Sequence, residues 1–425
     1  MTKRTIGAVE SYYGRPLDHA DRLDLVRWLG SHGFNAYAYG PKDDPYHRER
    51  WREPYPQAEL EQLRELCEFG RSVGVDIGLG VSPGLDWKGP DDDAALATKL
   101  RSLSQVGATL MAVAWDDVPR PSGEPAAALG AEHGRAIAAA MEAVSDDASW
   151  MAVPIDYAGN VVTPYLRAFS DALPGEIGIA WTGPGIVSVD VPASTARDLA
   201  EQLGRKLLFA DNFPVNDGPM SGTLHLGPYP EREAALVDEV SGVFFNFMPN
   251  KPIASRVGLG CAAAWWNDPS SDRDQTWLEL VRSFDGLEPL ARACRSWVSD
   301  PAIDPELLAM AADGRLLPWL IEGCRAGLDP KLEAEVEPWL DQWEWEGMAL
   351  QCALIAKMLP THELKFLTAT FWQIARRTLY NVFGIRLAMY PVTSTADAGF
   401  SVLPEALVQG ENLTDVLCRE AITGA

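Results

Sequence analysis

The chain has 425 residues, 47% of them hydrophobic and 23% charged, which fits a large globular domain plus a second one and not a disordered chain. Asp and Glu (60) outnumber Lys and Arg (36), and the net charge of −24 argues against nucleic acid or an anionic membrane as partner. Its cysteines are scattered without a CxxC pair, and it has neither a signal-peptide pattern at the N-terminus nor a membrane-length apolar run. We therefore expect a cytoplasmic protein.

Short apolar runs alternate with amphipathic helical patterns as far as residue 270. Repeated βα units imply a parallel sheet, and eight units in about 250 residues is the size of a (β/α)8 barrel of the TIM type. A doubly wound α/β sheet is the alternative, but no glycine-rich fingerprint follows the first run. The strands are expected at Thr5–Ser11, Asn35–Gly40, Asp76–Ser82, Thr109–Asp117, Ser149–Tyr157, Glu176–Gly183, Lys206–Phe213 and Gly242–Met248. The helices between them are expected at Asp18–Ser31, Gln57–Val73, Asp92–Val106, Glu124–Val144 and Ser194–Gly204.

The pattern changes after the eighth strand, where the string Asn267-Asp-Pro-Ser-Ser-Asp272 is typical of a domain boundary. The sequence predicts a catalytic barrel over residues 1–270 and an all-helical domain over residues 271–425. Tryptophans of the second domain are expected in its core, with a ligand groove as the alternative. Long helical periodicity is seen at Gln275–Val298, Leu332–Met358 and Leu364–Met389.

Polar side chains gather at the expected C-terminal ends of the strands, where barrel enzymes keep their active sites. Asp116 and Asp117 follow a buried apolar run directly, although a helix cap or a solvated turn is the alternative for such a pair. The mixture of carboxylates, amides, a lysine and aromatic residues suits a hydroxyl-rich ligand such as a sugar. It lacks the clustered cations of a phosphate site. Because His47 is the only imidazole near these ends, we expect no metal and no cofactor.

The adjacency of the two acids narrows the chemistry. Glycosidases that use two flanking carboxyl groups hold them about 5 Å apart when retaining and about 6.5–9.5 Å apart when inverting. Neighbouring residues of one strand point in divergent directions and are poorly placed to flank a sugar carbon. They could serve a 2-acetamido sugar, whose own amide oxygen attacks the anomeric carbon. One aspartate would orient the amide, and the other would protonate the leaving oxygen and later activate water.

These residues in this order resemble glycoside hydrolase family 84, the β-N-acetylglucosaminidases that include protein O-GlcNAcases. The resemblance touches nearly every expected strand, whereas the helical domain matches only in kind. The matching strings are Val9-Glu-Ser-Tyr-Tyr-Gly-Arg-Pro16, Tyr39-Gly-Pro-Lys-Asp-Asp44 with His47-Arg48, Trp51-Arg-Glu53, Ser82-Pro-Gly-Leu-Asp86, Trp115-Asp-Asp117, Trp181-Thr-Gly-Pro184, Asp211-Asn212, Asn216-Asp217 and Leu226-Gly-Pro-Tyr229.

The resemblance implies a (β/α)8 barrel that hydrolyses terminal β-linked GlcNAc with retention, through an oxazoline intermediate. It implies that Asp116 assists the acetamido group and that Asp117 is the general acid/base. Tyr157 falls where the family contacts the acetamido oxygen. The positions where the family binds sugar hydroxyls or lines the pocket are occupied by Lys42, Asn212, Asp217, Asn246, Thr182, Val187 and Ser11.

The chain departs from the family pattern at positions near the expected pocket. Ser11 stands where the family commonly has Gly, Ala210 where it has Trp, and Gly218 where it has Tyr. Because that Trp helps to enclose the N-acetyl group, we expect a wider pocket. A hexosaminidase for a different N-acyl sugar and a non-catalytic glycan-binding protein are therefore the alternatives. The expected partner is a GlcNAc-containing glycan or glycoprotein, and we hypothesise a homodimer through the helical domain.

Overall fold

The computed structural model describes residues 4–119, 125–144, 148–298, 303–322, 327–377, 380–384, 392–394, 400–402 and 411–424. These residues fall into two compact units. The first consists of Met1–Val215, Glu231–Pro252 and Ala262–Ser271. The second consists of Asn216–Pro230, Ile253–Cys261 and Asp272–Ala425.

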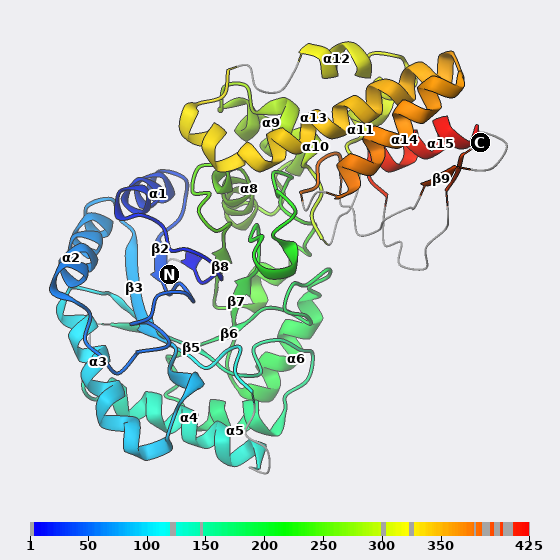
Figure 1. Ribbon diagram of the computed structural model, residues 1–425. Helices are drawn as coiled ribbons and strands as arrows, with labels where there is room; N and C mark the ends of the chain where they lie inside the picture. Colours follow the sequence, from blue (N-terminus) through cyan, green and yellow to red (C-terminus); the bar gives the residue numbers. More distant parts are fainter. Residues whose placement is uncertain are drawn as a thin grey trace. The chain divides into compact units, whose positions relative to one another are not determined.

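The first unit is a closed barrel of eight parallel strands in sequential order, with β1 pairing to both β2 and β8 (Figure 1). The expected (β/α)8 barrel is therefore confirmed. The ladder ends earlier than the apolar runs suggested, so Asp116 and Asp117 lie in the loop after β4 and not on the strand. The strands are β1 Thr5–Glu10, β2 Ala36–Tyr39, β3 Asp76–Val81, β4 Leu110–Ala114, β5 Ser149–Val153, β6 Gly178–Trp181, β7 Leu208–Asp211 and β8 Gly242–Asn246.

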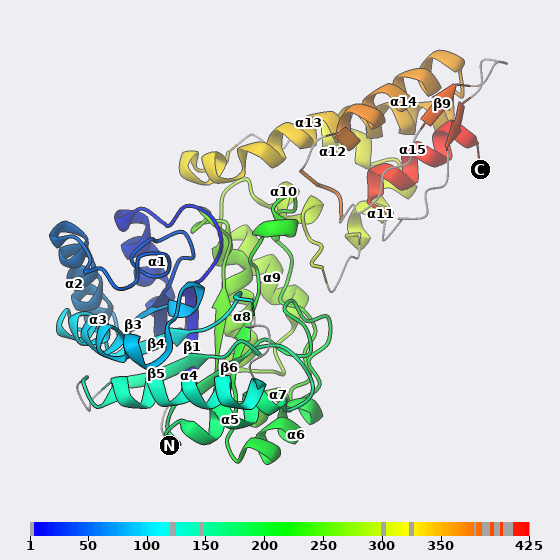
Figure 2. The same cartoon turned by 60° about the horizontal axis from the view of Figure 1, so that its bottom comes forward.

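Helices surround the barrel, as Figure 2 shows. One that the sequence pattern did not reveal, α5, begins at a short capping signal: the Thr163 hydroxyl accepts a hydrogen bond from the Leu166 backbone N–H, and Pro164 opens the first turn. The helices of this unit are α1 His19–Ser31, α2 Gln57–Ser72, α3 Asp93–Gln105, α4 Ala126–Met141, α5 Pro164–Ala172, α6 Ala193–Leu203 and α7 Leu236–Glu239, and α8 Ser255–Asn267 runs through both units.

Inward-facing side chains fill the barrel. Leu110, Met151, Leu208 and Phe244 form one buried cluster with small residues from the neighbouring strands. Gly7 makes room for the Phe244 ring, because a Cβ at Gly7 would lie 2.3 Å from a ring carbon. Alternate residues of a strand share a face. Ala210, two residues after Leu208, and Asn246, two residues after Phe244, therefore face the same barrel interior, nearer its C-terminal end.

The second unit is predominantly helical, as expected, and α13 and α14 lie side by side in both ribbon views (Figures 1 and 2). No described helix is both long and apolar enough to cross a bilayer. The elements are α9 Arg273–Arg282, α10 Glu288–Ala293, α11 Pro305–Ala312, α12 Leu316–Glu322, α13 Pro330–Met358, α14 His362–Arg377 and α15 Leu413–Thr423, with two antiparallel strands β9 Val392–Ser394 and β10 Phe400–Val402 that the sequence pattern did not indicate.

Two details of this unit differ from expectation. The helix expected over 275–298 is broken, because Gly286 takes a φ of 73° and a proline opens α10. The helix expected over 364–389 ends at Arg377, and the described residues 380–384 are not helical, while 378–379 and 385–389 lie outside the described residues. Trp339, Trp343 and Trp372 are buried, which confirms their place in the core.

Candidate active site

The Asp116–Asp117 pair occupies the C-terminal end of β4, where the backbone turns sharply. Asp117 has a φ of 55°, a left-handed conformation that aspartate tolerates better than most residues with a side chain. The turn places the two neighbouring carboxylates in different surroundings. The Asp116 side chain is only 13% exposed, whereas Asp117 is an exposed residue.

Asp116 is held ionised by a buried cation. Burial on its own would raise the pKa of the Asp116 carboxyl, but the charge and hydrogen bond of Lys42, helped by Arg48, outweigh it and bring the pKa below its ordinary value. Lys42 Nζ donates to Asp116 Oδ2 at 2.5 Å, and the lysine side chain is 2% exposed. The resemblance placed Lys42 at the sugar hydroxyls, and the structure pairs it with Asp116.

The other carboxylate oxygen of Asp116 lacks a hydrogen-bond donor among the described residues. Asp116 Oδ1 is buried and accepts no hydrogen bond from any described residue. A buried carboxylate oxygen without a donor is unusual, because losing its bonds to water is costly. Asp116 therefore presents an acceptor suited to an N–H group of a ligand.

Asp117 is bracketed by two phenols. Tyr157 Oη donates to its Oδ1 at 2.7 Å, and Tyr13 Oη donates to its Oδ2 at 2.9 Å. Burial, followed by the charge of Asp117, raises the pKa of Tyr13 to about 12 and that of Tyr157 further, so both hydroxyls stay protonated donors. The sequence reasoning missed Tyr13, although it lies within the Val9–Pro16 string. Tyr157 was expected at the acetamido oxygen, and here it contacts the neighbouring acid.

The loops after β5 and β6 are tied together beside this pair. The Thr182 backbone N–H donates to the Tyr157 carbonyl at 2.8 Å, and the Thr182 hydroxyl donates to the Gly185 carbonyl at 2.8 Å. Val187 is half-buried in the same loop. Both residues expected in the pocket wall therefore lie in the loop that is bonded to the Tyr157 backbone.

Amide side chains form a second connected group. Asn246 Nδ2 donates to Asn212 Oδ1 at 3.1 Å, and Asn212 Nδ2 donates to the Ile186 carbonyl at 2.8 Å. Asn246 Oδ1 accepts from the Ser11 backbone N–H at 3.3 Å. The structure thus brings three of the expected binding residues together. Asp217 belongs to the second unit, where it precedes a short 3-10 turn at Gly218–Met220, and its contact with a sugar stays a prediction.

The positions that depart from the family pattern carry little bulk. Ala210 is a half-buried residue level with Phe244 in the barrel interior. At Gly218, which has a φ of 51°, an added Cβ would meet nothing within 4 Å. Among the described residues, no group of three or more His, Cys, Asp or Glu side chains is arranged to hold a metal ion.

A closed parallel barrel with carboxylates, amides and phenols at the C-terminal ends of its strands has the general architecture of a barrel enzyme's active site. Residues 6–298 match the beta-N-acetylglucosaminidase family, and the chain belongs to this family.

Known relatives agree with this assignment. The chain is 31% identical over 336 residues to the protein O-GlcNAcases of Rattus norvegicus and of Mus musculus, matching 74% of this chain but 36% of each relative. It therefore spans only about a third of those relatives' length. A solved variant of the O-GlcNAc hydrolase of Thermobaculum terrenum superposes with a TM-score of 0.77 at 28% identity, covering 88% of both chains.

Proposed function

We propose that the protein is a retaining β-N-acetylglucosaminidase that removes terminal β-linked GlcNAc by substrate-assisted catalysis. The observation that carries the proposal is the contrast within the acid pair. Asp116 is largely buried beside Lys42 and has one oxygen without a donor among the described residues, whereas Asp117 is exposed and accepts hydrogen bonds from two phenols. Such a difference in environment suits two neighbouring carboxyl groups to different tasks.

In the first step, the acetamido oxygen of the substrate attacks the anomeric carbon and the glycosidic C–O bond breaks. Asp116 Oδ1 accepts the acetamido N–H, orienting the amide and stabilising the positive charge that develops on it. Asp117, protonated at this stage, gives its proton to the leaving oxygen. The products are the aglycone alcohol and the protonated oxazoline, an oxazolinium ion that faces the Asp116 carboxylate, with Asp117 left as a carboxylate.

In the second step, Asp117 removes a proton from a water molecule, whose oxygen attacks the anomeric carbon and reopens the oxazoline ring. Two inversions at the same carbon give overall retention. Asn212, Asn246 and Asp217 are proposed to bind sugar hydroxyls. The connected amides of the first two support this role, because they offer donors and acceptors at fixed positions.

The test is turnover of two β-GlcNAc substrates, one with a chromogenic aglycone and one with an alkyl aglycone. Asp117→Asn should slow hydrolysis of an alkyl β-GlcNAc about 10²-fold or more, the scale of general acid catalysis. Asp116→Asn should be at least as damaging, because the amide loses the charge that orients it. Wild-type turnover no faster than that of the double Asp→Asn variant would defeat the proposal and leave the non-catalytic glycan-binding protein as the better reading.

A second candidate, hydrolysis of a sugar with a larger N-acyl group, is supported by one small residue inside the barrel. Ala210 stands where the family has the enclosing tryptophan. A higher kcat/KM for an N-propionyl or N-butyryl β-glucosaminide than for the N-acetyl compound would favour this candidate. A steep fall with acyl length would exclude it.

For the aglycone we propose a polypeptide. The exposed large apolar side chains described in the first unit are Tyr13, Leu85, Val161, Ile186 and Val189, and all lie in the segments that follow the C-terminal ends of strands. An apolar rim suits peptide side chains better than the hydroxyl-rich surface of a polysaccharide. Faster hydrolysis of a GlcNAc-modified peptide than of chitobiose would support this, and the reverse order would refute it.

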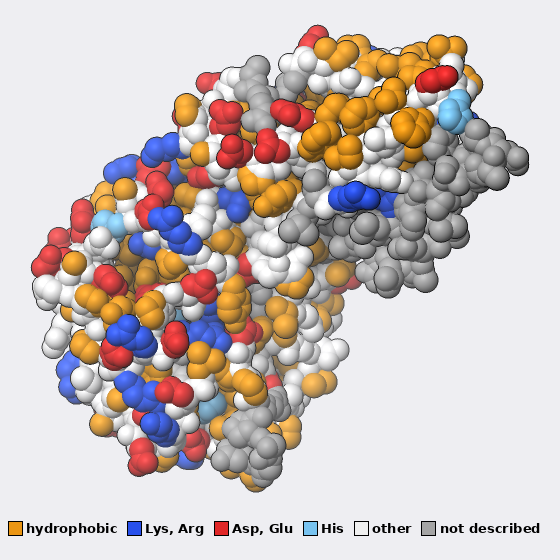
Figure 3. Space-filling view, viewed as in Figure 1, with side chains coloured by type: hydrophobic (Ala, Val, Ile, Leu, Met, Phe, Trp, Pro, Cys, Tyr) orange, Lys and Arg blue, Asp and Glu red, His pale blue; other side chains and the backbone are white. Residues whose placement is uncertain are grey.

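We also propose that the protein forms a homodimer through its helical unit. Met358, Leu359, Phe366 and Leu367 are exposed at the end of α13 and along α14, and Figure 3 shows hydrophobic side chains gathered on the surface of this unit. Sedimentation should give a dimer that Phe366→Glu dissociates, and a monomeric wild type would refute the proposal.

A cytoplasmic setting is proposed on the five described cysteines, which are all free thiols.

A further inference from the structure

The loop after β2 carries Arg48 on a firmly held backbone. The Asp44 carboxylate organises its start, with Oδ1 accepting from the Tyr46 backbone N–H at 2.8 Å and from the His47 backbone N–H at 3.3 Å. Its Oδ2 accepts from Tyr39 Oη at 2.7 Å and from Tyr55 Oη at 2.9 Å. Since Asp44 is buried, these bonds fix the turn that leads to Arg48.

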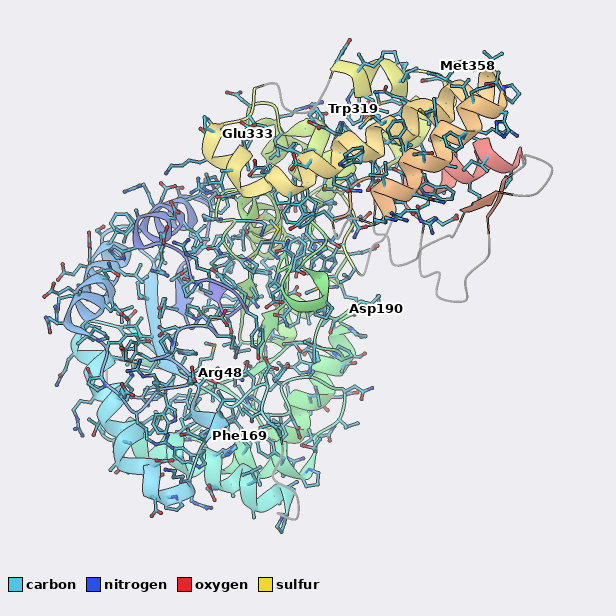
Figure 4. The ribbon with its side chains drawn as sticks, in the orientation of Figure 1. Arg48, Phe169, Asp190, Trp319, Glu333 and Met358 are labelled. Carbon is cyan, nitrogen blue, oxygen red and sulfur yellow. The ribbon has the colours of Figure 1, made fainter. Side chains whose placement is uncertain are left out.

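The same loop is joined to β3, the strand that separates β2 from β4. His47 Nδ1 bonds to the Gly80 carbonyl at 3.0 Å, and the Ser82 backbone N–H donates to the His47 carbonyl at 2.8 Å. Arg48 therefore begins beside β3 and its side chain extends towards the end of β4. Figure 4 shows Arg48 among the elements of the barrel.

The Arg48 guanidinium contacts the Asp117 backbone and lies near the Tyr13 ring. Arg48 is 6% exposed, and its Nη2 donates to the Asp117 carbonyl at 3.1 Å. Its guanidinium carbon is 5.9 Å from the centre of the Tyr13 ring, whose hydroxyl holds Asp117 Oδ2. The carbonyl that accepts this hydrogen bond belongs to Asp117, the residue with the left-handed φ of 55°. An L-residue in that conformation needs support from its surroundings.

We propose that Arg48 is a positioning residue that aims the Asp117 carboxyl at the leaving oxygen by fixing the Asp117 backbone and the Tyr13 ring. The inference rests on the proposed role of Asp117 as general acid/base. Without the guanidinium, the Asp117 carbonyl loses its donor and the backbone is free to leave the left-handed region. The carboxyl would then turn away from the substrate.

The test compares leaving groups, because a good leaving group needs no proton from the enzyme. Arg48→Met should lower kcat/KM about 10²-fold for an alkyl β-GlcNAc but less than about 5-fold for the 2,4-dinitrophenyl compound. Arg48→Lys should lower kcat/KM for the alkyl substrate nearly as much as Arg48→Met does, since an ammonium cannot reproduce the length and the two-pronged shape of a guanidinium. The matched control is Arg52→Met in the same loop, because Arg52 binds Asp86 and Asp92 and should leave both rates within about 2-fold.

A double-mutant cycle then asks whether Arg48 acts through Asp117. In an Asp117→Asn background, Arg48→Met should cost only the small part by which Arg48 helps Lys42 to lower the pKa of Asp116, about 5-fold or less, and not the ~10²-fold loss seen with Asp117 present. An equal loss on both substrates, or a loss that persists at full size in that background, would overturn the inference. Arg48→Gln, which keeps an N–H donor, repeats the comparison if the Met variant does not fold. No turnover of either substrate by the wild type would defeat the proposed function instead.

Discussion

Replacing Lys42 with Met tests whether this lysine sets the charge of Asp116 or only binds the sugar. Its Nζ lies 2.5 Å from Asp116 Oδ2, with side-chain exposures of 2% and 13%. Removing one partner of such a buried pair costs about 3–5 kcal/mol, because the remaining charge loses both its partner and its hydration. In this variant the Asp116 carboxyl should bind a proton more readily, since burial raises its pKa and the largest opposing charge is gone.

The assay is kcat/KM against pH for the wild type, Lys42→Met and Lys42→Arg. The acidic limb should move to higher pH in the Met variant, with a loss of about 10²-fold or more at neutral pH, equivalent to about 2.7 kcal/mol of transition-state stabilisation. Arg keeps the charge and should keep the limb near its wild-type position. An activity loss in the Met variant with an unmoved acidic limb would refute the reasoning and return Lys42 to sugar binding alone.

The unfolding free energy should depend on pH for the same reason. In the wild type the Asp116 carboxyl has a lowered pKa, so the Lys42 pair contributes stability above about pH 4 and loses it as the pH falls through the folded-state value. In Lys42→Met the buried carboxyl has a raised pKa, and its cost grows as the pH rises. The difference in unfolding free energy between wild type and variant should therefore be larger at pH 7 than at pH 4.

The remaining predictions concern the phenol on Asp117, the buried histidines and the acyl pocket. Tyr157→Phe should lower kcat/KM at least about 10-fold, since it removes a donor to the acid/base, and an unchanged rate would contradict that contact. Burial lowers the pKa of His47 to about 4, of His133 to about 3 and of His225 to about 4, so unfolding takes up protons between about pH 6.5 and 4. Each of these histidines should lower the unfolding free energy by up to about 1.4 kcal/mol per pH unit as the pH falls through this range. Chemical denaturation that shows no pH dependence of the unfolding free energy there would refute the prediction. Ala210→Trp should make the enzyme reject N-butyryl substrates, and electron-poor acyl groups should slow the wild type if the substrate's amide is the nucleophile.

The barrel could be predicted because eight buried parallel strands leave eight apolar runs in the sequence. The ends of those strands could not be predicted, since apolar side chains continue past the last paired residue: the run at β4 reaches Trp115, whereas the strand ends at Ala114. Helix α5 was missed because it is only 9 residues long and its capping residue lies in a polar stretch. The 275–298 pattern misled for the opposite reason, because its apolar periodicity continues across the glycine that breaks the helix.

The sequence marks the candidate site residues one by one, but it does not give their partners. A family string can mark Lys42 as functional, yet only the closed barrel places it against Asp116, two strands away. Tyr13 and Arg48 were present in the matching sequence and carried no separate signal. Their importance arises from contacts with Asp117 between the loops after β1, β2 and β4, and such contacts have no counterpart in the spacing of residues along the chain.

The left-handed turn at Asp117 explains how two adjacent acids can divide one reaction. If the backbone continued as a strand, the two carboxylates would point to opposite faces of the sheet, one into the barrel and one towards the helices. The positive φ turns Asp117 into the open loop region while Asp116 stays beside Lys42. The buried acid keeps its charge and one open acceptor for an N–H, and the exposed acid can exchange protons with a leaving group and with water. For the proposed reaction this backbone conformation is the structural requirement, so Arg48, which donates to the Asp117 carbonyl, should matter as much for the rate as a side chain that touches the sugar.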